Sequence, residues 1–248
     1  MPIRFPTHQG FAMASLREIL GAAYAESRFH QAARLEACVF LNRGRRFEIV
    51  ALPRDVQLAP VFGMGVADVD GDGLDDLFSS QNFFGTVSDL SREDNGRGAL
   101  SRGDGRGAFR AVDTWVSGIR LLGEGRGAAM ADFDHDGRWD LAVGQNGGPT
   151  KLLRNRGAKP GLRVVLEGTR ANPDAIGAQV RLIYPGGRRG PCRTVGAGSG
   201  YWSQDAATPL LGRLETPESV WVRWPGGRET TVRVDGNATT VRIACEPR

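Results

Sequence analysis

Two acidic segments of ten residues carry carboxylates at the spacing expected of metal ligands. Residues 68–77 and 132–141 both have aspartate at positions 1, 3, 5 and 9, glycine at position 6 and leucine at position 10. A hard cation such as Ca2+ takes about six to eight oxygen ligands, and glycine permits the tight bend that gathers them. The spacing therefore predicts two Ca2+ sites.

The predicted ligands are the aspartate side chains and the main-chain carbonyl at position 7 of each segment. They are Asp68, Asp70, Asp72, Leu74 and Asp76 in the first site, and Asp132, Asp134, Asp136, Arg138 and Asp140 in the second. An EF-hand would need a glutamate at position 12, where this chain has Ser79 and Val143. Short apolar runs flank both segments, so we expect the loops to connect strands. The alternative is an acidic turn without metal.

The repetition extends beyond the acidic segments. Residues 39–44 recur loosely at 99–103 and 152–157, and the two acidic segments start 64 residues apart. Repeats of roughly 40–60 residues holding several short strands are typical of propeller blades. Because two blades cannot close a propeller, we expect neighbouring blades to be missing from this chain. Apolar strands such as Val66-Ala67 and 141–143 are then expected to be exposed.

The segments on either side of these repeats have different patterns. Ser15 and Glu18 have capping-box spacing, and apolar residues at three- and four-residue steps predict one helix from Ser15 to Cys38. After the link Pro160-Gly161, we predict strands over residues 162–167, 178–184, 220–224, 230–234 and 239–244. Pro-Gly-Gly follows an aromatic residue at positions 184 and 224, which predicts hairpin turns.

The two halves resemble known families. Asp-x-Asp-x-Asp-Gly-x-x-Asp-Leu after a short apolar strand resembles the FG-GAP or VCBS repeats of integrin-alpha-type propellers. Residues 172–178, 198–204 and 222–227 are similar to the ASPIC/UnbV domain. The pairing resembles the cartilage acidic protein family, and it implies that this chain is a C-terminal fragment of a bacterial member. The resemblance implies architecture and calcium more than an activity.

The predicted fold class is all-β. It comprises incomplete integrin-alpha-type β-propeller blades and a C-terminal antiparallel β sandwich or barrel, with one N-terminal helix. We predict a helical lead-in over residues 1–37, FG-GAP/VCBS-like blades with two calcium loops over 38–157, and an ASPIC/UnbV-like domain over 161–246.

An aromatic cluster near the C-terminal half is a second candidate site. Tyr201, Trp202 and Gln204 combine flat apolar rings with an amide, which suits a carbohydrate or protein ligand. The alternative is that Tyr201 and Trp202 fill the core of the small domain.

Composition narrows the possible partners. The net charge of +4 comes almost wholly from arginines that alternate with apolar residues, which indicates solvated strand faces and no nucleic-acid partner. No apolar run approaches the ~18 residues of a membrane span. Cys38, Cys192 and Cys245 form no zinc or redox motif. A Cys192–Cys245 disulfide and buried thiols both stay open.

These observations predict a calcium-binding extracellular recognition or adhesion module, in the extracellular space or the periplasm. The first ten residues lack the apolar core of a signal peptide, so we expect a truncated chain. One alternative is an enzyme of unknown reaction that uses a calcium-dependent propeller site, although no catalytic motif is found and a non-enzyme is favoured. The other alternative is a purely structural scaffold.

Overall fold

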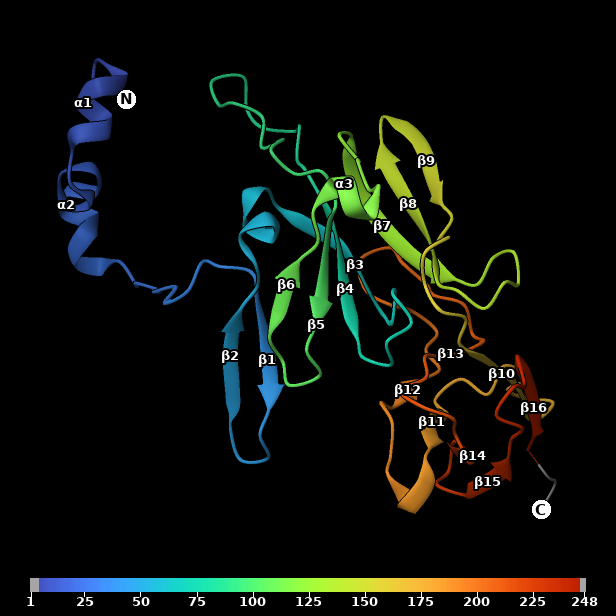
Figure 1. Cartoon of the computed structure of the whole chain (residues 1–248). Coiled ribbons are helices and arrows are strands. Elements are labelled where there is room, and N and C mark those ends of the chain that lie inside the picture. The colour runs from blue at the N-terminus through green and yellow to red at the C-terminus, as the bar shows by residue number, and fades with distance from the viewer. Residues whose placement is uncertain (1–4, 246–248) are drawn as a thin grey trace. The chain divides into compact units, whose positions relative to one another are not determined.

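The computed structural model describes residues 5–245, and the chain divides into two compact units. The first unit ends at Leu35 and the second begins at Glu36. Figure 1 labels the helices and strands of both units.

The first unit contains three short helical segments where the sequence predicted one long helix. They are α1 (His8–Met13), α2 (Leu16–Leu20) and the 3-10 helix η1 (Gly21–Glu26). The predicted start is confirmed, because the Ser15 hydroxyl accepts from the Glu18 N–H and the Glu18 carboxylate accepts from the Ser15 N–H. The predicted extension to Cys38 is wrong. Gly21 takes a φ of +56° directly after α2, and this left-handed conformation ends the regular helix.

Residues 36–153 form three antiparallel sheets, each built from strands that are consecutive in sequence (Figure 1). The sheets are the hairpin β1-β2, the four-stranded β3-β4-β5-β6 and the three-stranded β7-β8-β9. Their strands are β1 (Cys38–Asn42), β2 (Phe47–Ala51), β3 (Val61–Ala67), β4 (Asp76–Gln81), β5 (Ala99–Gly103), β6 (Phe109–Ala111), β7 (Glu124–Ala131), β8 (Asp140–Asn146) and β9 (Gly148–Leu153). The 3-10 helix η2 (Arg54–Leu58) and the helix α3 (Thr114–Ser117) connect strands.

The C-terminal part contains two further sheets, ordered β13-β10-β16 and β12-β11-β14-β15. Their elements are β10 (Leu162–Glu167), β11 (Gln179–Ile183), η3 (Pro185–Gly187), β12 (Arg193–Thr194), β13 (Leu210–Leu211), β14 (Ser219–Arg223), β15 (Glu229–Arg233) and β16 (Thr240–Ala244). The five predicted strands are confirmed to within one residue. One pairing differs from the expected antiparallel arrangement, because β10 and β16 run parallel.

Both predicted Pro-Gly-Gly turns are confirmed. The N–H of Gly187 donates to the Tyr184 carbonyl, and the N–H of Gly227 donates to the Trp224 carbonyl. All four glycines of these turns have positive φ, which a glycine adopts without steric cost. The sheets and turns confirm the all-β fold class. No sheet within residues 5–245 closes into a barrel.

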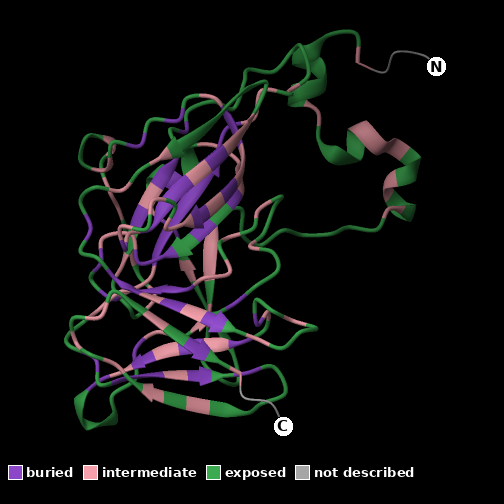
Figure 2. Ribbon diagram, turned by 90° about the vertical axis from the view of Figure 1, so that its right-hand side faces the viewer, coloured by how far each residue is buried: buried purple, intermediate pink, exposed green. Residues whose placement is uncertain are grey.

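The hydrophobic core explains why the expected exposure of apolar strands is mostly wrong. Ala67, Leu141 and Val143 are buried, whereas Val66 is 51% exposed. The sheets β3–β6 and β7–β9 share one apolar cluster, which also contains Leu210 of β13. Figure 2 shows this buried centre in purple. A second cluster fills the space between the two C-terminal sheets, with Tyr184 and Trp224 among its buried residues.

The cysteines form neither the Cys192–Cys245 disulfide nor the buried thiols that the sequence left open. Cys38, Cys192 and Cys245 are all free. Cys192 is exposed and the other two are half-buried, so they are not buried thiols either.

Candidate metal centres and aromatic groove

Each acidic loop joins the first two strands of its sheet, as predicted. Residues 68–75 connect β3 to β4, and residues 132–139 connect β7 to β8. The aspartate at position 9, which begins the second strand, ties the loop to the end of the third strand. Both oxygens of this aspartate accept backbone N–H groups, at 2.9 Å from Val69 and 3.1 Å from Gly103 for Asp76.

The same two hydrogen bonds recur in the second loop. Asp140 accepts the N–H of Phe133 at 3.1 Å and that of Asn155 at 2.8 Å. A buried carboxylate that accepts two backbone N–H groups holds three chain segments in register. Position 9 therefore has a structural role in both repeats.

The aspartate at position 1 shapes the turn of each loop. Asp68 accepts the N–H groups of Gly71, Asp72 and Gly73 at 2.8 to 3.0 Å. Asp132 accepts the N–H of Gly137 at 3.2 Å. The position 6 residues Gly73 and Gly137 have φ values of +88° and +84°, which is the reason for glycine at that position.

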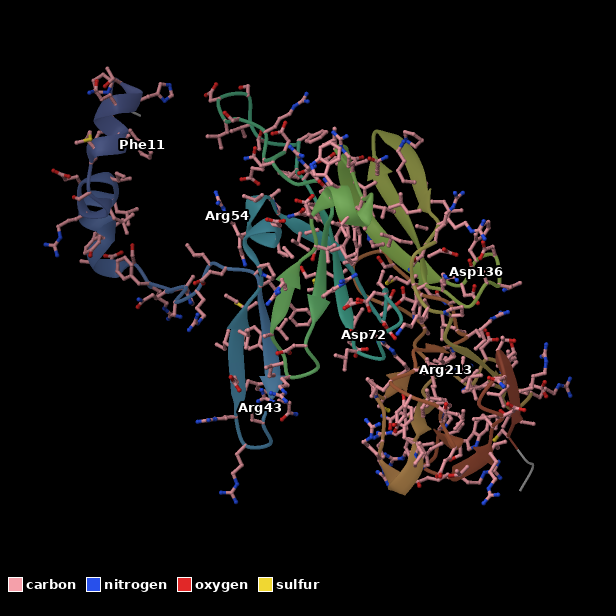
Figure 3. All side chains as sticks on the ribbon, in the orientation of Figure 1. Phe11, Arg43, Arg54, Asp72, Asp136 and Arg213 are labelled. Carbon is pink, nitrogen blue, oxygen red and sulfur yellow. The ribbon has the colours of Figure 1, made fainter. Side chains whose placement is uncertain are left out.

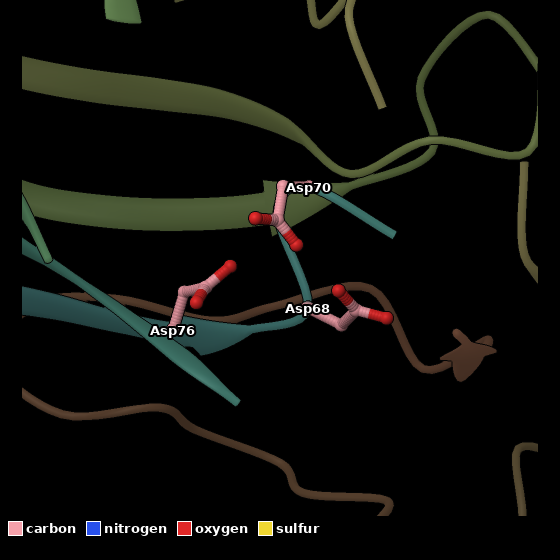
Figure 4. Close-up of side chains that lie close together, drawn as sticks. All are labelled: Asp68, Asp70 and Asp76. Atoms are coloured by element: carbon pink, nitrogen blue, oxygen red, sulfur yellow. The ribbon is translucent and has the colours of Figure 1, made fainter. Parts of the chain in front are cut away.

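Three predicted ligands come together in each loop. The carboxylates of Asp68, Asp70 and Asp76 each place an oxygen within 4.8 Å of the others, and Figure 4 shows all three. A cluster of Asp132, Asp134 and Asp136 meets the same condition in the second loop. Oxygen atoms at this separation can hold a cation between them.

The remaining predicted ligands lie outside these clusters. Asp72 is exposed, and Asp140 carries the structural hydrogen bonds described above. Leu74 and Arg138 both donate their N–H to the position 5 aspartate, at 2.8 and 3.0 Å, so the two loops turn in the same way. Figure 3 labels Asp72 and Asp136, the two aspartates at position 5. Ligation by the carbonyls of Leu74 and Arg138 stays a prediction.

Burial makes the first cluster electrostatically unfavourable without a cation. It raises the pKa of Asp68 and that of Asp76 to about 6, against hydrogen bonds from Gly73 and Gly103 that act in the opposite direction. Neighbouring aspartates raise both pKa values further. A bound cation would reverse this effect, because it stabilises the ionised carboxylates.

Each third strand contributes an arginine to its own loop. The Arg102 guanidinium, at the end of β5, lies 2.7 Å from the Asp70 carboxylate. In the equivalent place after β9, Arg154 pairs with Asp134 and also lies 3.3 Å from Asp136. Both arginine side chains are about half exposed.

The C-terminal part of the chain also contacts both loops. Arg163 of β10 lies 3.2 Å from Asp132, and Arg193 of β12 pairs with Asp75. The link between the two parts contributes backbone hydrogen bonds, because the N–H of Gly161 donates to the Gly137 carbonyl at 2.7 Å. These arginines are only 21% and 15% exposed, so the prediction of solvated strand faces is wrong for them. Arg163 neutralises the buried side chain of Asp132, whereas Arg193 pairs with Asp75, whose side chain is 40% exposed.

The predicted aromatic cluster lies at the surface and not in the core. Tyr201 is 40% exposed and Trp202 is 83% exposed. The two rings are stacked, with centroids 5.1 Å apart, and Tyr201 also contacts Phe62 of β3 at 5.5 Å. Tyr201, Trp202 and Gln204 all line one groove over β7 and β8.

The turn that carries this cluster is fixed to the edge of β7. The Ser203 hydroxyl accepts the N–H of Ala128, and the Asp205 carboxylate accepts the N–H of Met130, both at 2.8 Å. The N–H of Ala206 donates to the Met130 carbonyl at 2.9 Å. The segment therefore substitutes for a strand along this edge of β7.

A buried ion pair lies beside the groove. Arg126 and Glu124, both on β7, form a pair 2.5 Å long in which the two side chains are 13% and 5% exposed. Glu124 also accepts from the Phe84 N–H and the Asn146 amide. Although burial acts to raise the pKa of Glu124, these hydrogen bonds and the guanidinium hold it below its ordinary value.

Comparison with protein families matches both halves of the chain. Residues 68–143 match the FG-GAP-like repeat, and residues 168–244 match the ASPIC and UnbV family. The chain combines FG-GAP-like repeats with an ASPIC/UnbV domain. A search of curated proteins gives no match. Among the described helices, none is long and apolar enough to cross a membrane.

Sequence reasoning identified the aspartates of the FG-GAP-like repeats but missed their arginine partners. The signal for Arg102 and Arg154 was available, because both follow the aliphatic residues of the repeated third-strand segment. Ser203 and Asp205 of the ASPIC/UnbV domain had no comparable signal. Their partners on β7 are 75 residues away in sequence.

Proposed function

We propose that this chain is a calcium-binding recognition or adhesion module that works in the extracellular space or the periplasm. The observation that carries the proposal is the pair of carboxylate clusters, one in each of the two acidic loops within the residues that match the FG-GAP-like repeat. Oxygen ligands from aspartates suit a hard cation, and Ca2+ tolerates the irregular geometry of such a loop. Extracellular calcium modules bind with dissociation constants of about 0.1 to 1 mM, and we expect an affinity in this range for a protein that works outside the cytoplasm.

The first loop should be the tighter site. It contains the carboxylates of Asp68, Asp70, Asp72, Asp75 and Asp76, and two guanidinium groups from the described part of the chain, Arg102 and Arg193, pair with them. The second loop contains Asp132, Asp134, Asp136 and Asp140, and these are approached by Arg138, Arg154 and Arg163. The larger excess of negative charge attracts a divalent cation more strongly.

Calorimetric titration with Ca2+ and with Mg2+ tests the proposal. We expect calcium binding, and at 100 times the dissociation constant each site should stabilise the protein by about 2.7 kcal/mol. Asp70→Asn and Asp134→Asn test the two loops separately, because neither carboxylate makes the pair of backbone hydrogen bonds seen at position 9. Asp94→Asn, an exposed acid outside the loops, is the matched control.

The variants are expected to differ in calcium binding. Asp70→Asn should remove the tighter of the two binding events, whereas Asp94→Asn should leave the titration unchanged. The absence of any heat with calcium, together with a melting temperature that a chelator does not lower, would contradict it.

A further inference from the structure

We propose that the groove beside Trp202 binds a neutral oligosaccharide. This inference rests on the proposed function in treating the protein as a recognition module, and it names the chemical class of the ligand. The groove, called here the Trp202 groove, has a volume of about 490 Å³. Small residues of β7 and β8 form its floor, among them Ala129, Ala142 and Gly144.

The conformation of Trp202 is costly in two respects. Its φ is +44°, which is a strained conformation for a bulky residue and costs about 1 to 3 kcal/mol. Its indole is 83% exposed, so the strain is not compensated by burial in the core. Such outliers concentrate at ligand sites, where the surrounding structure holds them in place.

The turn around Trp202 is held rigidly. The N–H of Ser199 donates to the Ser203 carbonyl at 2.9 Å, and the Ser203 hydroxyl donates to the Tyr201 carbonyl at 2.7 Å. The bonds from Ala128 and Met130 to Ser203 and Asp205 fix the same turn to β7. A ligand would therefore meet a preformed surface, with little entropy lost on ordering it.

The aromatic pair supplies a flat platform. The planes of Tyr201 and Trp202 are inclined by only 22°, and the Tyr201 ring also contacts Phe62, with centroids 5.5 Å apart. Stacking on Tyr201 uses one face of the indole, and the high exposure of Trp202 leaves ring area open to solvent. The apolar face of a pyranose ring can bury this area, while its hydroxyls remain free for hydrogen bonds.

The polar groups of the groove select against a charged ligand. The side chains of Gln145, Asn146 and Gln204 are neutral amides, which both donate to and accept from hydroxyls. Among the residues that the structure describes, Arg126 is the one charged residue that lines the groove, and Glu124 already neutralises it. An anionic polymer or a nucleic acid would need uncompensated positive charge, so a neutral ligand fits better.

The backbone of β7 also disfavours an extended peptide. Strand addition would need free N–H groups along the edge of β7. The N–H groups of Ala128 and Met130 are already bonded to Ser203 and Asp205. Strand addition is therefore disfavoured, and recognition through the side chains of the groove suits a saccharide.

The experiment titrates the whole chain with neutral hexasaccharides of glucose, mannose, xylose and N-acetylglucosamine, and with a heparin fragment. Calorimetry measures binding in every variant, and tryptophan fluorescence is recorded for the unmodified chain. We expect at least one neutral sugar to bind with a dissociation constant of about 1 mM or below, with a blue shift as the indole is desolvated. Trp202→Ala should weaken binding by about tenfold or more. Trp115→Ala, which removes another indole that is 77% exposed, should leave it unchanged.

Several results would overturn the proposal. One is no binding of any neutral sugar up to about 10 mM, and another is binding of the heparin fragment alone. Equal losses in the two tryptophan variants would mean nonspecific adsorption. Self-association that Trp202→Ala abolishes, seen by light scattering, would assign the platform to a second copy of the chain.

Calcium titration of Trp202→Ala separates this inference from the proposed function. Trp202 is not among the residues of the acidic clusters, so the variant should bind calcium normally. If the unmodified chain binds calcium normally but binds no neutral sugar, only the proposal for the Trp202 groove is defeated. Sugar binding that depends on Trp202 in a protein that binds no calcium would support the groove and defeat the calcium proposal.

Discussion

Aspartates at different positions of the acidic loops have different tasks. Asp76 and Asp140 use both oxygens for backbone N–H groups, whereas Asp70 and Asp134 accept one N–H each and face an arginine. The spacing of the motif predicted all of these carboxylates as ligands. It could not show that Asp76 and Asp140 also hold the loop in place, because this role depends on Gly103 and Asn155, which reach the loop from another strand.

At the same scale, Glu124 should make stability depend on pH. Its folded-state pKa is held below the ordinary value, so its stabilising contribution is complete above about pH 5 and is lost as pH falls through the folded-state pKa. Glu124→Gln should lower the free energy of unfolding by about 2 kcal/mol at pH 7, and by less in acid. Urea unfolding at several pH values measures this.

The matched control for Glu124 is Glu48→Gln. Glu48 pairs with Arg43 at the surface, where both side chains are about half exposed, and such pairs contribute little. Suppose that Glu124→Gln and Glu48→Gln lower the free energy of unfolding equally at neutral pH. The buried network of Glu124, Arg126 and Asn146 would then not be the source of the pH dependence of stability.

At the scale of elements, the strands could be predicted from the sequence, but the contacts between their sheets could not. Apolar runs and Pro-Gly-Gly turns placed five C-terminal strands to within one residue. β12 and β13 were missed because each is two residues long, too short for a periodic pattern. The N-terminal helix was predicted too long because its apolar spacing continues beyond Gly21, where the backbone changes direction.

The edge of β7 offers a test of one such contact. Asp205→Ala removes the acceptor for the Met130 N–H and should cost about 1 to 3 kcal/mol of unfolding free energy. Asp205→Asn keeps an acceptor oxygen at the same place and removes a carboxylate whose pKa is raised by burial. We therefore expect the asparagine variant to be close to the parent. Denaturant unfolding gives the energies, and hydrogen exchange of the Met130 amide reports the contact itself. Equal losses in both variants would contradict this role for Asp205.

At the scale of the whole molecule, ion pairs connect the C-terminal part of the chain to the acidic loops of the repeats. The net charge of +4 suggests a basic surface, yet Arg163 of β10 and Arg193 of β12 are directed at the acidic loops of the repeats. Composition could not show this, because it does not reveal which charges lie together. The arrangement places a cation from one domain where calcium is proposed to bind in the other.

Arg163 should therefore compete with calcium for the second loop. Its guanidinium lies 3.2 Å from Asp132, one of the three clustered carboxylates. Arg163→Ala removes this like charge and should tighten calcium binding there by about fivefold, equivalent to about 1 kcal/mol, while it lowers stability without calcium. By thermodynamic reciprocity, calcium should weaken the hold of β10 on the loop, so that hydrogen exchange in β10 becomes faster when calcium is added.

Arg242→Ala, which removes an exposed arginine paired with Glu167 at 3.7 Å, should change neither quantity. Weaker calcium binding in Arg163→Ala would mean that the two cations cooperate, and that β10 helps to build the proposed second metal site.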